Sequence, residues 1–179
     1  MKYNELFEAA KSDKIECSPL NFKLDALSPV ISKHTVDVHF NTLTKAYFKK
    51  YEATGDSFQK AGAVLHNQFW SILKPYDEKN KPTKTSMNFI EQHHGSWKKF
   101  NDSILESAST IHGSGWVMLS PAGKIIMVPN HAIKPNVLLI DLWEHSTVDS
   151  DFNKESFIKG FWKIVNWDAV DKNIIANIK

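Results

Sequence analysis

Asp141 and His145 are the two residues whose types and spacing most directly suggest chemistry. They lie four residues apart, directly after the apolar run 137–140, which is typical of a buried β-strand. If the strand ends near Asp141 and a helix has begun by His145, both side chains can converge on one cation. A capping Asp and a surface His have the same spacing, so a metal site needs further ligands from elsewhere in the chain.

Two more histidines lie in apolar stripes of helices that flank a turn. One predicted helix runs from the cap at Ser32 to Gly55 and carries His39, and the next carries His66 and stops at Pro75. The two must form an antiparallel hairpin, in which His39 and His66 are offset by about five residues, or ~8 Å along the axis. Both imidazoles can therefore reach one ion, although either could instead be a hydrogen-bonded core histidine.

The elements around these residues predict an α+β fold with two domains. An N-terminal helical hairpin domain spans residues 1–76, and a C-terminal α/β domain spans residues 85–179, with a polar linker between them. The C-terminal domain is expected to hold helices at 87–94, 96–111 and 157–178, and strands at 116–119, 124–128 and 137–142. Residues 1–20 could add a short amphipathic helix.

Composition excludes several classes of protein. The 179 residues are 42% hydrophobic, which is enough for a full core, and the single cysteine, Cys17, excludes an internal disulfide framework and favours a reducing, cytoplasmic location. The first 20 residues contain no continuous hydrophobic segment, so neither a signal peptide nor a membrane partner is expected. All 22 basic residues are lysine and none is arginine, which argues against nucleic acid as a partner.

Together, His39, His66, Asp141 and His145 supply three imidazoles and one carboxylate, a set suited to iron or manganese. Along nearly its whole length the sequence resembles the iron/manganese superoxide dismutase family. The matching stretches are 27–32 leading into His39 and Tyr47, His66 with 69–70 and Pro75, 95–100, 113–116, 141–145, and 161–162 followed by 166–167.

The resemblance implies a helical hairpin, an α/β domain with a three-stranded antiparallel sheet, and one redox metal between them. The four residues matching the metal ligands are His39, His66, Asp141 and His145, and a fifth position holds solvent. The implied activity is disproportionation of superoxide to oxygen and hydrogen peroxide. Iron is favoured over manganese, because relatives with a histidine at the position of His131 include iron enzymes.

Further positions are assigned by the same resemblance. Tyr47 matches the tyrosine at the mouth of the substrate channel, and His131 matches a residue that hydrogen-bonds the solvent ligand. Gly62, one helical turn before His66, is expected to leave room for His131. Three tryptophans are expected to wall the site: Trp70, Trp116 and Trp143.

The expected assembly is a homodimer, because Glu144 matches a residue that reaches the partner's metal histidine. The sequence also departs from the family here, with Leu43 and Val148 in place of a polar pair at the dimer interface. An apolar contact can replace that pair. The link between Tyr47 and His66 is about twenty residues shorter than in long-hairpin members, and the loop 149–156 is also shortened.

Two other functions fit parts of the pattern. A non-catalytic interaction protein on the same fold would be expected to lose metal ligands first, whereas all four are present here. A non-haem iron oxygenase would use two histidines and one carboxylate, and the fourth protein ligand disfavours it. Of the remaining histidines, His34, His93 and His94 are expected to be solvated, and His112 is expected to fill a ring-shaped space.

Overall fold

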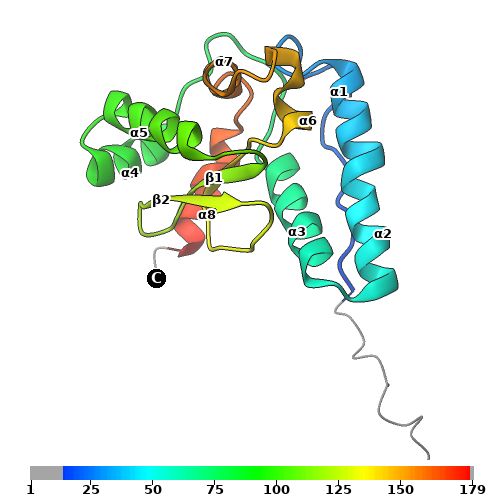
Figure 1. Ribbon diagram of the computed structural model, residues 1–179. Helices are drawn as coiled ribbons and strands as arrows, with labels where there is room; N and C mark the ends of the chain where they lie inside the picture. The colour runs from blue at the N-terminus through cyan, green and yellow to red at the C-terminus, as the bar shows by residue number, and fades with distance from the viewer. Residues whose placement is uncertain (1–13, 178–179) are drawn as a thin grey trace, which may run out of the picture.

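The sheet at the centre of the molecule has three antiparallel strands in the order β2-β1-β3 (Figure 1). The strands are β1 (Gly115–Leu119), β2 (Ile125–Pro129) and β3 (Leu138–Asp141), in a computed structural model that describes residues 14–177. Every residue of β1 and β3 is buried, as expected of strands covered on both faces. The register pairs Trp116 with Asp141, which brings both residues to the end of the sheet beside the helical hairpin. The predicted α+β fold is confirmed.

The N-terminal helices begin and end where the capping residues indicate. The first helical segment comprises α1 (Lys33–Asp37), η2 (Val38–Thr44) and α2 (Lys45–Thr54), and the return helix is α3 (Ser57–Ser71). Gly55 ends α2 with a φ of 67°, a left-handed conformation that glycine adopts without steric cost. Asp56 then accepts the N–H of Gln59 and caps α3. The chain turns between these two caps.

The segment η2 is a π-helical stretch, which the sequence pattern does not predict. A regular α-helix would continue the buried stripe from His39 to Leu43, but a π turn inserts one extra residue and moves the buried face along by one position. Thr44 is therefore fully buried and Leu43 is half-buried. The buried face resumes along α2 at Tyr51.

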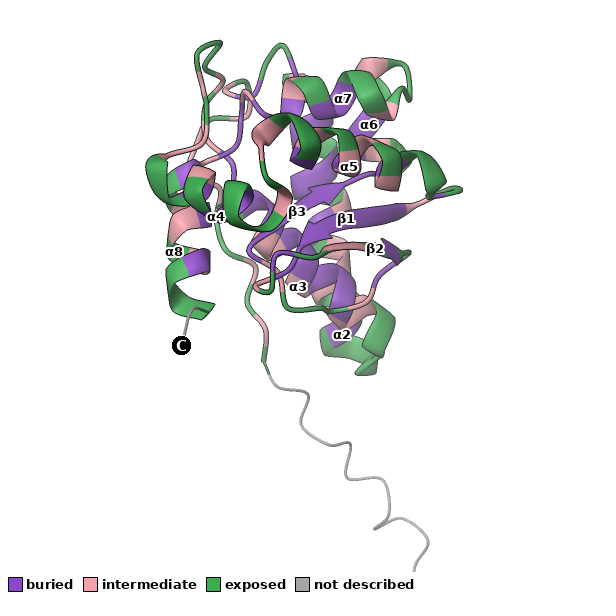
Figure 2. Cartoon of the chain, turned by 90° about the vertical axis from the view of Figure 1, so that its left-hand side faces the viewer, coloured by how far each residue is buried: buried purple, intermediate pink, exposed green. Residues whose placement is uncertain are grey.

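Two pairs of helices cover the sheet away from the hairpin. They are α4 (Lys84–His94) with α8 (Trp167–Asn177), and α5 (Trp97–Thr110) with α7 (Lys154–Phe161), and α5 packs directly on β1 and β2. The short α6 (Glu144–Thr147) and η3 (Val148–Ser150) follow β3. Buried residues line the strands and the inward faces of the helices (Figure 2). No described helix is both long and apolar enough to cross a membrane.

Two predicted helix boundaries are wrong. The helix expected at 87–94 begins three residues earlier, because Thr83 accepts the N–H of Ser86 and caps it. The helix expected over 157–178 is two helices separated at 162–166, where Val165 forms a β-bridge with Leu73. Local periodicity cannot reveal that break, since the bridge partner Leu73 lies about ninety residues away in the sequence.

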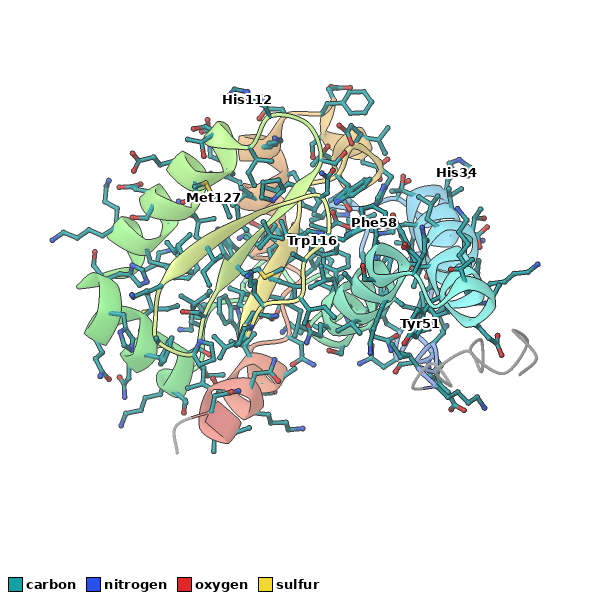
Figure 3. The ribbon with its side chains drawn as sticks, turned by 60° about the horizontal axis from the view of Figure 1, so that its bottom comes forward. His34, Tyr51, Phe58, His112, Trp116 and Met127 are labelled. Carbon is teal, nitrogen blue, oxygen red and sulfur yellow. The ribbon has the colours of Figure 1, made fainter. Side chains whose placement is uncertain are left out.

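Two other expectations concern the chain start and His112. The helix expected within residues 1–20 falls mostly on residues 1–13, which lie outside the described part, and residues 14–20 form no helix. His112 does not fill a core space: it is exposed at the edge of the molecule (Figure 3), and the neighbouring Ile111 is buried instead. His34 and His93 are exposed as expected, whereas His94 is half-buried with its ring 5.1 Å from that of Phe100.

Candidate metal centre

Four side chains from four separate elements meet between the hairpin and the sheet. His39 comes from η2, His66 from α3, Asp141 from the end of β3, and His145 from α6. Their potential ligand atoms all lie within 4.8 Å of one another. The Nε2 atoms of the three histidines lie 3.3, 3.7 and 3.4 Å from Asp141 Oδ2, in chain order.

The atoms that face one another in this cluster lack hydrogen-bond partners. Asp141 Oδ2 and the Nε2 atoms of the three histidines are all buried and unpartnered. The other oxygen of Asp141, Oδ1, accepts the N–H of Trp143 at 2.9 Å, which orients the carboxylate. Unpaired buried polar atoms are costly, so a group of four that converge on one point fits a bound cation.

The hydrogen bonding of His66 indicates which of its nitrogens is free. Its Nδ1 lies 2.7 Å from the carbonyl oxygen of Gly62, and only a protonated nitrogen can donate to that oxygen. The Nε2 of neutral His66 therefore carries a lone pair and faces the carboxylate oxygen of Asp141. Two electron-rich atoms in this arrangement repel each other unless a positive charge lies between them.

Burial keeps the imidazoles in the neutral form that a metal requires. Desolvation lowers the pKa of His39 to about 4 and that of His66 to about 3. Burial alone would raise the pKa of Asp141, but the interactions with the adjacent imidazoles of His145 and His39 outweigh it and hold that pKa well below its usual value. At neutral pH His39 and His66 therefore offer neutral nitrogens beside the carboxylate of Asp141.

Aromatic side chains enclose the cluster, as predicted for the three tryptophans. The ring of Trp70 lies 4.7 Å from His39, that of Trp116 lies 5.2 Å from His66, and that of Trp143 lies 5.7 Å from His145. Trp116 sits in the middle of Figure 3, between the sheet and the hairpin. The enclosure makes the site a low-dielectric space, in which charge interactions are stronger than in water.

Two further residues of this enclosure are missed by the sequence reasoning. The hydroxyl of Thr44, which the π turn buries, accepts the indole N–H of Trp70 at 3.0 Å. Phe69 stacks against His39 with 5.7 Å between ring centroids. Thr44 gives no signal in the sequence, because its burial depends on the irregular turn in η2.

Tyr47 and His131 lie beside the cluster and are joined by a hydrogen bond. The indole N–H of Trp116 donates to His131 Nδ1 at 3.1 Å, so the proton of neutral His131 must be on Nε2. That nitrogen lies 2.8 Å from the hydroxyl oxygen of Tyr47 and donates to it. Desolvation lowers the pKa of His131 to about 4 and raises that of Tyr47 to about 12, so both groups stay neutral near pH 7.

The ring of Tyr47 lies in the space that a side chain at Gly62 would occupy. A Cβ at position 62 would lie 2.5 to 2.8 Å from three carbons of the Tyr47 ring, which is closer than van der Waals contact permits. Whether the glycine also leaves room for His131, as expected from the sequence, stays a prediction. Because the π turn moves the buried face of the helix by one position, the Tyr47 ring lies against α3. There it also stacks on His66, with 5.1 Å between the ring centroids.

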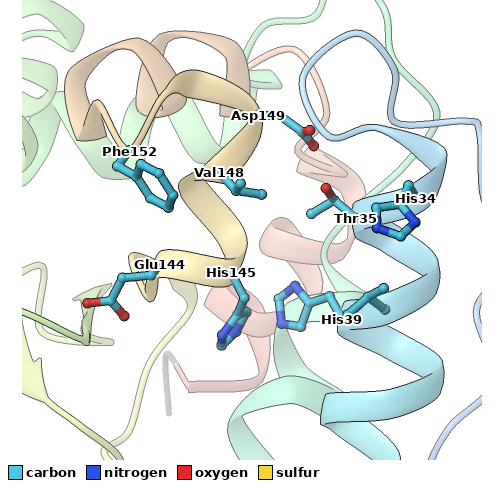
Figure 4. A pocket seen from close by; sticks show the side chains of 9 residues that line it. His34, Thr35, His39, Glu144, His145, Val148, Asp149 and Phe152 are labelled. Carbon is cyan, nitrogen blue, oxygen red and sulfur yellow. The ribbon is translucent and has the colours of Figure 1, made fainter.

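A pocket of about 340 Å³ opens next to the cluster, between α1 and α6 (Figure 4). Its lining includes two of the cluster residues, His39 and His145. The exposed apolar residues at its edge are Val38, Val148 and Phe152, with 37%, 40% and 60% of their surface accessible. Glu144 also lines the pocket, and its carboxylate accepts the hydroxyl of Ser114 at 2.7 Å.

The fold and cluster define a class of metalloprotein in which one ion lies between a helical hairpin and an α/β unit. Residues 82–173 match the model for the C-terminal domain of iron/manganese superoxide dismutases, which is just over half of the chain. The chain belongs to the iron/manganese superoxide dismutase family.

Relatives named for each of the two metals are similar over most of both chains. An iron superoxide dismutase of Saccharolobus solfataricus is 29% identical, over 90% of this chain and 93% of the relative. One from Methanothermobacter thermautotrophicus is 28% identical over 88% and 93%. A mitochondrial manganese superoxide dismutase of Aspergillus fumigatus is 29% identical over 94% and 96%. The similarity therefore does not distinguish iron from manganese.

Proposed function

We propose that this chain is a superoxide dismutase that binds one iron or manganese ion through His39, His66, Asp141 and His145. The observation that supports the ligand assignment is the convergence of four unpartnered buried atoms, with the lone pair of His66 aimed at the others. The activity is that of the family to which the chain belongs. The overall reaction converts two superoxide anions and two protons to one oxygen and one hydrogen peroxide.

When bound, the ion supplies one-electron oxidation and reduction between its trivalent and divalent states. Asp141 stays ionised and partly neutralises the ion, so the site keeps a net positive charge that attracts an anion. The tryptophans around the cluster limit its contact with bulk water, so groups of the protein are the proposed source of protons.

Tyr47 is the proposed proton donor at the site. Its oxygen accepts the Nε2–H of His131, so its own hydroxyl proton is free to point elsewhere. Because its pKa is raised to about 12, Tyr47 keeps this proton at physiological pH. His131 fixes the position of the Tyr47 hydroxyl, and Trp116 in turn fixes the tautomer of His131.

The proposal is tested by metal analysis of the purified protein together with a superoxide consumption assay. About one equivalent of iron or manganese per chain and dismutation that disappears on metal removal are the expected results. All four proposed ligands are present in the described cluster, so nothing in it favours the non-catalytic alternative. A protein that holds neither metal, even after reloading, would contradict the proposal.

We also propose that the protein is located in the cytoplasm, a location favoured by the single cysteine.

We also propose that two copies of the chain form a dimer through the face that holds the pocket. Glu144 is exposed there, and its hydrogen bond to Ser114 holds its carboxylate in place. Val148 has an apolar neighbour across the pocket in Val38, whereas Leu43 does not line it. Exposed apolar side chains around a charged group suit a contact between two copies related by a two-fold axis.

The dimer is expected to depend on Val148. Val148→Asp places a charge in the apolar patch and should shift the protein from dimer to monomer, as measured by light scattering across a dilution series. Ile175→Asp is the matched control, since Ile175 is 62% exposed on α8, far from the pocket, and the change should leave the dimer intact. A parent protein that is monomeric and fully active at low concentration would show that Glu144 has no role across an interface.

His131→Gln is expected to retain the metal but to change the balance between iron and manganese. A glutamine can accept from Trp116 and donate to Tyr47, but it lacks the ring that stacks on Trp143 at 4.5 Å. Because a tenfold change in the relative stabilisation of hydroxide and water at the ion corresponds to only ~1.4 kcal/mol, a small change in geometry should alter the relative activities of the two metal forms. Specific activity should be measured for iron-loaded and manganese-loaded forms, with the exposed His112→Gln as control. Unchanged activities with both metals would show that His131 is only structural.

A further inference from the structure

Asp149 makes a hydrogen bond between two segments that lie far apart in the sequence. Its Oδ2 accepts the backbone N–H of Ser32 at 2.7 Å, across 117 positions. Figure 4 shows the carboxylate of Asp149 at one end of the pocket, near the start of the helix that carries His34 and Thr35. The bond therefore joins η3 to the N-terminus of α1.

Both ends of this hydrogen bond are close to proposed metal ligands. Ser32 caps α1 through its hydroxyl, which accepts the N–H of Thr35, and the helical segment continues to His39 seven residues later. Asp149 follows His145 by four residues, about one helical turn. Each end of the bond is therefore connected to a ligand by a short helical stretch of backbone.

Few other polar interactions hold these two segments together. Within the part of the chain that the structure describes, the hydrogen bonds and ion pairs that join residues 32–54 to residues 141–152 are this bond and the His39–Asp141 contact. The pocket of about 340 Å³ lies between the two segments, so side-chain packing is incomplete on this side. The negative charge of Asp149 at the start of a helical segment is also favourable, because the free N–H groups there carry partial positive charge.

We infer that Asp149 is a positioning residue that fixes the helix of His39 against the turn of His145 and so sets the geometry of the metal cluster. The inference rests on the proposed function, since it assumes that these histidines bind the ion. Asp149 does not touch the cluster: its effect passes through the backbone at Ser32 and through α6. Asp149 therefore acts like a residue that does not bind the metal itself but orients the residues that do.

The test compares variants of the full-length, iron-loaded protein by two readouts besides activity. Asp149→Ala should change the electron paramagnetic resonance spectrum of the ferric form and accelerate loss of iron to a chelator about tenfold. Asp149→Asn should restore the parental spectrum, because its amide oxygen can still accept the Ser32 N–H. Asp151→Asn removes a nearby exposed charge and should match the parent in both readouts.

An alanine variant with the parental spectrum and the parental rate of iron loss would overturn the inference, even if its melting temperature were lower. If Asp149→Ala does not fold, Asp149→Glu takes its place. The longer side chain must displace the carboxylate relative to Ser32, so a changed spectrum is expected and a parental one would overturn the inference. A parent chain that binds neither iron nor manganese would instead overturn the proposed function, and this inference with it.

Discussion

Replacing Asp141 or His145 by alanine is expected to abolish both metal retention and superoxide dismutation. Each change removes one of four ligands from a cluster in which Asp141 is fully buried and the His145 side chain is only 20% exposed. Loss of a residue that only orients a metal ligand typically lowers metal affinity 10- to 100-fold. Loss of a direct ligand should therefore lower the affinity by more than about 100-fold. Metal content after purification and the superoxide assay measure the two effects.

The ligand variants should also be less stable than the loaded parent. A metal that binds only the folded chain stabilises it, and that contribution disappears with the metal. His34→Ala and His112→Ala are suitable controls, since both histidines are exposed and lie outside the cluster. A ligand variant that keeps stoichiometric iron or manganese and normal activity would show that the site has been assigned wrongly.

The metal-free protein is expected to lose stability steeply as the pH falls below about 6.5. His39 and His66 have folded pKa values of about 4 and about 3, below the ordinary value of 6.5. The unfolded chain therefore takes up protons at a higher pH than the folded chain. The stability that neutral histidines provide is complete above pH 6.5 and is lost as the pH falls toward 4 and then 3.

This loss should be large enough to measure by urea unfolding. At pH 4.5 each of the two histidines is expected to cost on the order of 2–3 kcal/mol relative to neutral pH. His39→Gln should reduce the pH dependence by about one proton relative to the parent chain. A metal-free protein whose unfolding free energy is the same at pH 4.5 and pH 7 would contradict the neutral, buried state of these residues. Acidification should also release the metal from the loaded protein, since its ligands must be deprotonated.

The local signals in the sequence correctly predicted the framework of the site. Ser32, Gly55 and Asp56 mark the ends of the hairpin helices because capping depends only on residues a few positions apart. The run before Asp141 predicted a buried strand for the same reason. Together with the resemblance to the family, these signals indicated the four residues that the fold brings together. The division into domains at residues 76 and 85 stays a prediction.

The tertiary structure alone decided the details that depend on residues distant in sequence. The π turn that buries Thr44, the ring of Tyr47 against Gly62 and the break between α7 and α8 each break the pattern of local periodicity. The proton on His131 Nε2 follows from Trp116, and the bond from Ser32 to Asp149 spans 117 positions. Such contacts form only when packing brings separate elements together, and spacing along a chain carries no record of them.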